Sequence, residues 1–401
     1  MNSVAKSVST LIILVFAHAA PASEKADSAQ IDTYNFYEEV FWDQTFSQQS
    51  SASIITYPYH YISRALDNHS TKLSGGTSTG GQLKRFLQFS LIEVPMFSFG
   101  AVLQHELSHG FRMREMHCEP TYHFGLPPPY SFLNRNQRIL GEATDVDCRF
   151  MDRQLVALGG HEGNDVLADY LKQTSFTNET FARPISNLYV INRLELITYG
   201  VRKPSQKIEG VLQQKDVRSK ALLNFIDPLI FAAVLQNIDF IRTGEIKDVE
   251  DVFNYSPIYP FLSYRLVPYG ESFEAGMVAK AMDHLWELNI SKWDFNTYFS
   301  DHEKRDGFHI SFTVDSFLKK LAGSNFGYRV SLQTANEPYF KTGSWDEYSW
   351  VYGCQVALRL QPTPSGVGYF AGIDVKNRGY LPSKYLAPGS NAMIGLVLNQ
   401  M

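Results

Sequence analysis

The residues with the clearest capacity for chemistry lie in the segment VLQHELSHGF, where His105, Glu106 and His109 form the pattern H-E-x-x-H. On a helix, residues four apart lie on one face, so the two imidazoles can reach the same metal ion. Zinc suits this donor set, and Glu106 stands beside it as a general base for an attacking water. The pattern therefore predicts a hydrolytic Zn²⁺ site.

The residues around this pattern favour the helix that such a site requires. Apolar side chains at Val102, Leu103 and Leu107 can pack into a core, and neither proline nor a β-branched run interrupts residues 97–111. Burying two histidines and a carboxylate without partners in so apolar a segment would cost several kcal/mol. A purely structural helix is therefore the weaker interpretation.

A catalytic zinc needs a third protein ligand and one position open to water. The segment LGGHEGNDVLADYL offers Glu162 and, one turn later on the same helical face, Asp165. Three glycines would let this segment approach the first helix closely: Gly159, Gly160 and Gly163. Glu162 is thus the best candidate for the third ligand.

The two segments together resemble the gluzincin metallopeptidases, in which a glutamate from a later helix completes H-E-x-x-H and an acidic residue stands near it. This resemblance covers residues 97–111 and 158–170 only. It implies that Glu162 is a zinc ligand beside the two histidines, that Glu106 is the catalytic base and that Asp165 orients a ligand histidine. In the competing interpretation, Glu162 occupies the first turn of a helix, where the macrodipole favours acidic residues.

Other residues compete for the third ligand position. They lie in GEATDVD, HCEPTYHFG and NFIDPLIF, and they are Glu142, Asp145, His117, His123 and Asp227. The last is of interest because the intramembrane site-2 proteases also combine H-E-x-x-H with an aspartate from another apolar segment. The chain lacks their N-P-x-P-x-x-x-L-D-G pattern, and no histidine stands six residues after His109, as the metzincins require.

Peptide hydrolysis would also need a hydrogen-bond donor for the tetrahedral oxyanion. Three residues near the metal-site segments are candidates by their position in the sequence alone: Tyr122, His123 and His161. The ordinary alternative for each is a packed or surface side chain.

Helical patterns dominate the chain as far as residue 306. The apolar stretches 86–104 and 221–241 approach the length of a membrane span, but each contains carboxylates and a proline. We interpret both as buried core helices, with membrane spans as the alternative. Further helices are expected at residues 166–173, 185–200 and 271–289.

After residue 307, short alternating runs separated by turn residues predict strands: HISFTVDSF, GYRVSLQT, WVYGCQVALRL, VGYFAGIDV and AMIGLVL. They predict an antiparallel sheet or small barrel with one face on the helical core, while a sheet facing lipid is the alternative. The expected fold class is α+β. A mainly helical, zincin-like metal domain, residues 23–306, precedes a β-rich domain, residues 307–401.

The first 22 residues have the character of a secretion signal, because an apolar run is followed by small residues that offer cleavage sites. An uncleaved anchor helix is the alternative. Export would place the chain in the periplasm, at the outer membrane or outside the cell, where disulfides form. Cys118 and Cys148 would then pair, or all three cysteines, Cys354 included, would stay reduced.

The composition fits a folded protein with a large core and gives no sign of a nucleic-acid partner. Of 401 residues, 44% are hydrophobic, and the net charge of -5 comes from interspersed charges rather than long runs. The sequence therefore favours an exported zinc metallopeptidase with peptide or protein substrates. The alternatives are a non-enzymatic envelope protein, whose metal is structural or absent, and a membrane-embedded zinc protease.

Overall fold

The computed structural model describes most of the chain after its first 35 residues. The described ranges are 36–73, 77–127, 129–130, 141–146, 152–198, 207–208, 212–245, 249–250, 258–282, 284–295, 305–316, 319–321, 324–341, 343–344, 346–362 and 366–400. The predicted signal, residues 1–22, and Cys148 lie outside them. Cys118 is disulfide-bonded and Cys354 carries a free thiol, so the interpretation with three reduced cysteines is wrong.

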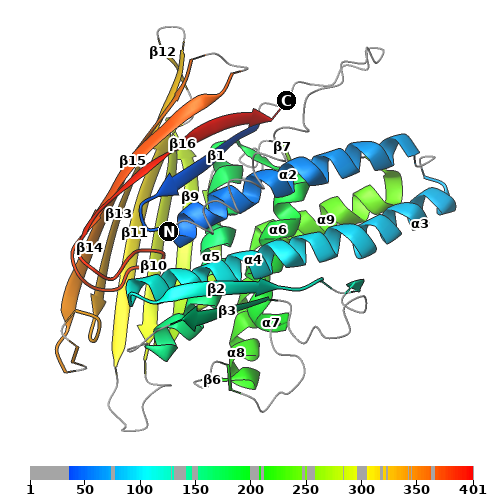
Figure 1. Ribbon diagram of the computed structural model, residues 1–401. Coiled ribbons are helices and arrows are strands. Elements are labelled where there is room, and N and C mark those ends of the chain that lie inside the picture. Colours follow the sequence, from blue (N-terminus) through cyan, green and yellow to red (C-terminus); the bar gives the residue numbers. More distant parts are fainter. Residues whose placement is uncertain are drawn as a thin grey trace. The chain divides into compact units, whose positions relative to one another are not determined.

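The described helices form a layer on one side of a large sheet (Figure 1). They are α2 (Gln48–Leu73), α3 (Thr79–Gln88), the π-helical turn η1 (Phe89–Glu93), α4 (Val94–Glu115), α5 (Arg153–Thr177), α6 (Arg183–Arg193), α7 (Glu195–Thr198), α8 (Gln214–Ala221), the 3₁₀ turn η3 (Leu222–Ile226) and α9 (Pro228–Thr243). Helix α4 packs against α5, and both also contact α2 and α6. The metal-site segments therefore lie at the centre of the helical layer.

The apolar stretch 86–104 is helical, as predicted, but only its second half is buried. It belongs to one continuous helix, Thr79–Glu115, whose length and composition would suffice to cross a membrane, and only 28% of its most apolar window is buried. Phe86 is 51% exposed, whereas Phe97 is fully buried. The prediction of a buried core helix is therefore wrong for the first half of this stretch.

The stretch 221–241 is not one helix, because it bends by 75° between η3 and α9. The Asp227 carboxylate caps α9 by accepting a hydrogen bond from the Leu229 N–H at 2.9 Å, and Pro228 takes the first helical position. Helix α9 turns one face outward, where Leu235 is 63% exposed. This stretch is therefore not a buried core helix either.

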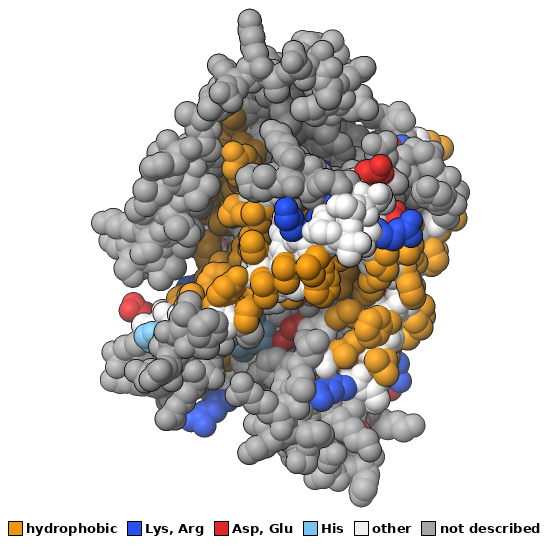
Figure 2. Space-filling model, turned by 90° about the vertical axis from the view of Figure 1, so that its right-hand side faces the viewer, with side chains coloured by type: hydrophobic (Ala, Val, Ile, Leu, Met, Phe, Trp, Pro, Cys, Tyr) orange, Lys and Arg blue, Asp and Glu red, His pale blue; other side chains and the backbone are white. Residues whose placement is uncertain are grey.

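Helices α3 and α9 contact each other, and together with η1 they expose an apolar patch. We call it the helical patch: Leu83, Phe86, Leu87, Leu91, Ile92, Phe231, Val234, Leu235 and Ile238. Figure 2 shows hydrophobic side chains gathered on this side of the molecule. The patch lies on the helical side, away from the large sheet (Figure 1).

In the described part of the chain, ten strands form the large antiparallel sheet. Nine follow the order β1-β16-β15-β14-β13-β11-β10-β9-β8, and β12 pairs with β13 alone, so the sheet is open. The strands are β1 (Phe36–Asp43), β8 (Ile258–Val267), β9 (Gly270–Ala281), β10 (His284–Asp294), β11 (Asp306–Ser316), β12 (Lys319–Leu321), β13 (Ser324–Glu337), β14 (Ser349–Gln361), β15 (Gly368–Lys376) and β16 (Gly389–Gln400). The α+β class and the antiparallel C-terminal strands are confirmed.

The sheet begins earlier in the chain than predicted. Strands β8 to β10 precede residue 306 and β1 precedes every described helix, so no division between a helical and a β domain is seen at that point. The helix predicted for residues 271–289 is wrong, because this segment contains strand β9 and most of β10. Its apolar residues Phe273, Ala275 and Met277 alternate with period two, as a strand requires.

The side of the large sheet that meets the helices, its inner face, is polar. Arg359 and Arg329 share the carboxylates of Glu39 and Asp315, with an Arg359 Nη2 to Asp315 Oδ2 distance of 2.9 Å. Charged residues of α5 make further ion pairs with this face; for example, Lys172 lies 3.0 Å from Glu287. The sheet does rest one face on the helices, and charged side chains share that layer with apolar ones such as Tyr264 and Leu266 of β8, which pack with Leu158 of α5.

Candidate metal centre

Helix α4 presents the H-E-x-x-H residues as a compact group. His105, Glu106 and His109 each offer one ligand atom, and these atoms lie within 4.8 Å of one another. The two imidazole rings have centroids 4.6 Å apart and stand almost perpendicular. His105 and Glu106 are each only 7% exposed. The predicted helix is confirmed, and both rings share one of its faces.

Helix α5 crosses this face at its glycines. A Cβ atom built on Gly160 would lie 2.4 Å from His105 Nε2 and 2.6 Å from His109 Nε2. One built on Gly163 would lie 1.9 Å from the Ser108 hydroxyl oxygen. The close approach predicted from these glycines is confirmed. Both Nε2 atoms therefore face the same point on the backbone of α5.

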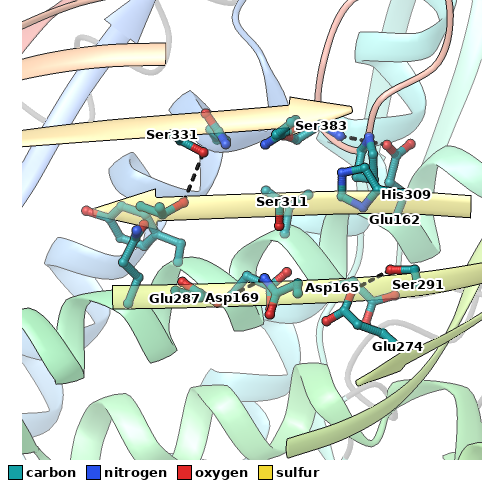
Figure 3. Close-up of a pocket in the computed structure, with 18 of the residues that line it drawn as sticks. Glu162, Asp165, Asp169, Glu274, Glu287, Ser291, His309, Ser311, Ser331 and Ser383 are labelled. Carbon is teal, nitrogen blue, oxygen red and sulfur yellow. Dashed lines mark hydrogen bonds between the residues drawn. The ribbon is translucent and has the colours of Figure 1, made fainter. Parts of the chain in front are cut away.

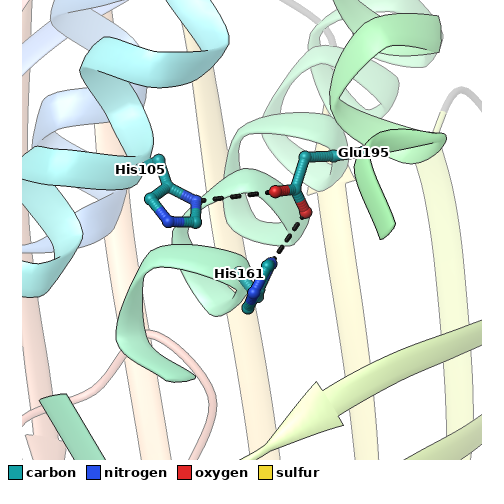
Figure 4. A group of neighbouring side chains, drawn as sticks. All are labelled: His105, His161 and Glu195. Atoms are coloured by element: carbon teal, nitrogen blue, oxygen red, sulfur yellow. Dashed lines mark hydrogen bonds and ion pairs between the residues drawn. The ribbon is translucent and has the colours of Figure 1, made fainter. Parts of the chain in front are cut away.

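His161 and Glu195 form a second group with His105, again with ligand atoms within 4.8 Å of one another. His161 Nδ1 lies 2.8 Å from Glu195 Oε2, and His105 Nδ1 lies 3.8 Å from Glu195 Oε1. Figure 4 shows the Glu195 carboxylate directed at both rings. From the sequence, His161 is predicted only as an oxyanion donor, and Glu195 is not predicted at all.

Each of the three rings directs its Nδ1 atom toward a polar group of the protein. His109 Nδ1 lies 2.6 Å from the Val156 carbonyl oxygen, and His105 Nδ1 lies 3.5 Å from Asn164 Nδ2. An acceptor at Nδ1, such as the carbonyl oxygen at His109 or the Glu195 carboxylate at His161, orients a histidine that binds a metal through Nε2. Burial, together with the neighbouring rings of His109 and His161, holds the pKa of His105 well below its usual range. His105 is therefore neutral at pH 7 and can donate a lone pair.

Glu162, predicted as the third ligand, belongs to neither group and is held by other residues. Arg112 Nη2 donates to both of its oxygens at 2.6 and 2.7 Å, and the Ser383 N–H donates at 2.8 Å. Successive residues on a helix point about 100° apart, so His161 faces the imidazoles while Glu162 faces Arg112 and the sheet. Glu162 also lies in the middle of α5, so the first-turn interpretation fails as well.

Asp165 likewise turns away from the histidines. It lines a polar cavity of about 140 Å³ between α5 and the inner face of the sheet, together with Glu162 and His309 (Figure 3). Its Oδ1 atom lies 3.5 Å from Arg193 Nη1. Glu195, and not Asp165, occupies the place of the carboxylate predicted to orient a ligand histidine.

Burial raises the pKa of Asp165 to about 7, despite the opposing charges of Arg265 and Arg193. The folded state therefore binds this proton more tightly than the unfolded state, and folding stability falls as pH rises through 4 to 7. Between pH 5 and pH 8, we expect the free energy of unfolding to decrease by a few kcal/mol less in Asp165→Asn than in the native chain. Urea unfolding of both proteins at the two pH values measures this difference. An identical pH dependence of stability in the two proteins would contradict the raised pKa of Asp165.

The rival ligands lie elsewhere. Glu142 is exposed on β3, and Asp227 accepts a hydrogen bond from the Tyr189 hydroxyl while capping α9. His117 and His123 are exposed. Neither histidine group contains any of these four residues, and the side chain of Asp145 lies outside the described part.

Two short strands, β2 (Glu119–Phe124) and β3 (Gly141–Val146), pair with each other and contact α4 (Figure 1). The Tyr122 ring lies over the α4 backbone at Gly110, and its hydroxyl accepts a hydrogen bond from Arg114 Nη1 at 3.1 Å. Burial and the Glu106 charge raise the pKa of Tyr122, while Arg114 opposes them. Of the three predicted oxyanion donors, Tyr122 is therefore protonated and close to Glu106, whereas His123 points to solvent.

Gly160→Ala is expected to abolish metal binding, because the added methyl group would enter the space that the two Nε2 atoms face. Gly163→Ala is the matched control. Its added methyl group would disturb the same contact between α4 and α5, at Ser108, but would not approach the two imidazole rings. Zinc content per chain, measured beside folding stability, separates the two effects. Equal zinc content in both variants would contradict a metal held at this point.

Comparison with known proteins assigns no function to any of these residues. The assignment of the centre rests on the arrangement of side chains from α4, α5 and α7. No protein-family model, curated protein or solved structure matches this chain.

Proposed function

We propose that this protein is a zinc-dependent metallopeptidase whose metal is held by His105, His109 and His161. Two observations carry the proposal: the Nε2 atoms of His105 and His109 face Gly160 of α5, and the next residue of α5, His161, has its ring centroid 5.0 Å from that of His105. Three imidazoles are a known zinc donor set that keeps a fourth position open. Zinc bound there would supply a water of lowered pKa and a polarising charge for the substrate carbonyl.

Glu106 is the general base in this proposal. Its carboxylate lies within 4.8 Å of the ligand atoms of His105 and His109, on the same helix. It accepts the proton of the attacking water and delivers it to the leaving amine. The Tyr122 hydroxyl is the donor that we assign to the oxyanion of the substrate.

Glu195 holds the rings in place. Its oxygens face Nδ1 of both His161 and His105, so it fixes their orientation and keeps Nε2 for the metal. The first 22 residues favour a location in the cell envelope, where peptides or proteins are the substrates of this class.

The roles of His161 and Glu195 can be separated by paired variants. We expect His161→Ala to lose zinc on purification, and Glu195→Gln to keep it with roughly 10- to 100-fold lower affinity. Competition with a chromophoric chelator measures both affinities. The opposite result, with zinc lost only from Glu195→Gln, would make Glu195 the third ligand and restore a gluzincin-like arrangement.

A structural zinc in a non-enzymatic protein is the second candidate, and the burial of the site favours it. His161 is only 1% exposed, and Gly141 of β3 covers Glu106 so closely that a Cβ there would lie 2.8 Å from Glu106 Cγ. This candidate predicts bound zinc without any hydrolysis by the native chain. Activity assays on zinc-loaded protein therefore discriminate between the two.

A further inference from the structure

The outer face of the large sheet, which points away from the helices, is apolar across the width of the sheet. Directly paired residues of antiparallel strands share a face, so the strand register defines rows across it. One row is Pro260, Met277, Leu288, Phe312, Leu332, Cys354 and Val375. The next is Ile258, Ala279, Trp286, Val314, Val330, Val356 and Ile373. Many of these side chains are exposed; Leu332, for example, is 50% exposed.

Aromatic residues gather toward both ends of the strands. Trp286 lies in the second row, Tyr328 and Tyr369 lie beyond it toward the same end, and Trp350 and Tyr352 lie toward the other end. Beyond the apolar rows, at the end with Trp350, stands an exposed ion pair: Lys292 with Asp306. Aromatic girdles between an apolar band and charged rims are typical of strands that face lipid.

The extent of the apolar rows along the strands matches the thickness of the apolar core of a membrane. On strand β14, Trp350 and Leu360 lie ten residues apart, which is roughly 33 Å along the strand at ~3.3 Å per residue. At the ~40° tilt of strands in outer-membrane barrels, this corresponds to roughly 25 Å along the membrane normal, the height of their apolar band.

The inner face completes the pattern, because it carries the buried ion pairs of Glu39, Asp315, Arg329 and Arg359. A sheet of a water-soluble protein buries its apolar face and exposes its polar one. Here the exposed face is the apolar one on strand after strand, and the buried face carries these ion pairs, as it does in membrane strands.

We infer that the outer face of the large sheet lies against the hydrocarbon core of a lipid bilayer. A second copy of the chain fits this face less well. Strand β1 contacts α2 and strand β8 contacts α5, so both edges curve toward the helices and the outer face is convex (Figure 1). Two convex faces would meet along a strip only. A bilayer around the molecule would also cover the helical patch on the opposite side (Figure 2), which one sheet-to-sheet contact would leave in water.

Cys354 provides a probe that needs no new residue, because its thiol is free and lies in the central row. The full chain, labelled at Cys354 with bimane, is reconstituted into phosphatidylcholine vesicles. Lipids brominated deep in the acyl chains should quench the bimane severalfold more than lipids brominated near the headgroup. Cys354→Ser, labelled in the same way, corrects for any other thiol. Quenching by aqueous iodide without quenching by the brominated lipids would overturn the inference.

Two arginine variants on β13 test the depth. Leu332 lies in the central row, whereas Asn336 lies four residues along the same face, in the row of Trp350. We expect Leu332→Arg to lower the folding equilibrium constant in vesicles by at least ~30-fold, and Asn336→Arg to change it less than ~5-fold. Equal effects of the two variants on the folding equilibrium constant would contradict a bilayer at this face. A native chain that is a dimer without detergent, and that Leu332→Arg converts to monomers, would contradict it as well.

Discussion

Replacing Glu106 by glutamine is expected to lower peptide hydrolysis by roughly 10²- to 10⁴-fold while zinc remains bound. Glutamine keeps the size of the side chain beside His105 but cannot accept the proton of the attacking water. The rate constant kcat on a fluorogenic peptide and the zinc content per chain are measured on the same preparation.

Glu142→Gln is the matched control, because Glu142 lies exposed on β3 and belongs to neither histidine group. It should leave both the rate and the zinc content unchanged. Full activity in Glu106→Gln would exclude Glu106 as the base. A native chain that holds zinc but hydrolyses nothing would favour the structural-metal candidate.

Replacing Glu162 by alanine is expected to lower the free energy of unfolding by about 3 kcal/mol, because it removes one partner of a buried ion pair. Arg112 is fully buried, and the substitution would leave its guanidinium with Glu115 as its remaining carboxylate, at 2.7 Å. Zinc should stay bound, since His161 and not Glu162 faces the α4 histidines. Urea unfolding in detergent micelles, with zinc content alongside, measures both quantities.

Glu162→Gln refines this test, because glutamine can still accept the hydrogen bond from the Ser383 N–H. Its loss of stability should be smaller than that of the alanine variant. Loss of zinc without loss of stability in either variant would instead support Glu162 as a ligand, as the gluzincin resemblance implies.

The helix that carries His105 and His109 could be predicted from the spacing of its residues, and so could the close approach of Gly160 and Gly163. The third histidine could not be predicted as a ligand, because the choice between positions 161 and 162 depends on where α5 begins. The Asp152 carboxylate caps α5 by accepting from the Gln154 N–H at 3.1 Å, so the helix starts well before Glu162. That starting point turns position 161 toward α4 and position 162 toward the sheet.

Glu195 gave no signal in the sequence. It lies 34 residues after His161, in the one-turn helix α7, and only the packing of α7 beside α5 brings its carboxylate to the ring. A contact of this kind depends on tertiary structure and not on a local repeat.

The strands after residue 307 could be predicted from their alternation, but the face that meets the helices could not. Period two defines two faces and does not say which one is buried. The polar face is buried here because partners distant in sequence neutralise it; Glu39, for example, pairs with Arg359. The sequence of the β9–β10 hairpin wrongly predicts a helix because small and apolar residues are mixed along residues 271–289.

The most direct measurement is the zinc X-ray absorption spectrum of the purified full chain loaded with one equivalent of zinc. We expect three imidazole nitrogens at about 2.0–2.1 Å and one oxygen ligand. His161→Ala, reloaded with one equivalent of zinc after purification, should show one imidazole fewer at whatever zinc it retains. A chain that retains no zinc, or a spectrum with fewer than two imidazoles, would contradict a metal centre at the contact of α4 and α5.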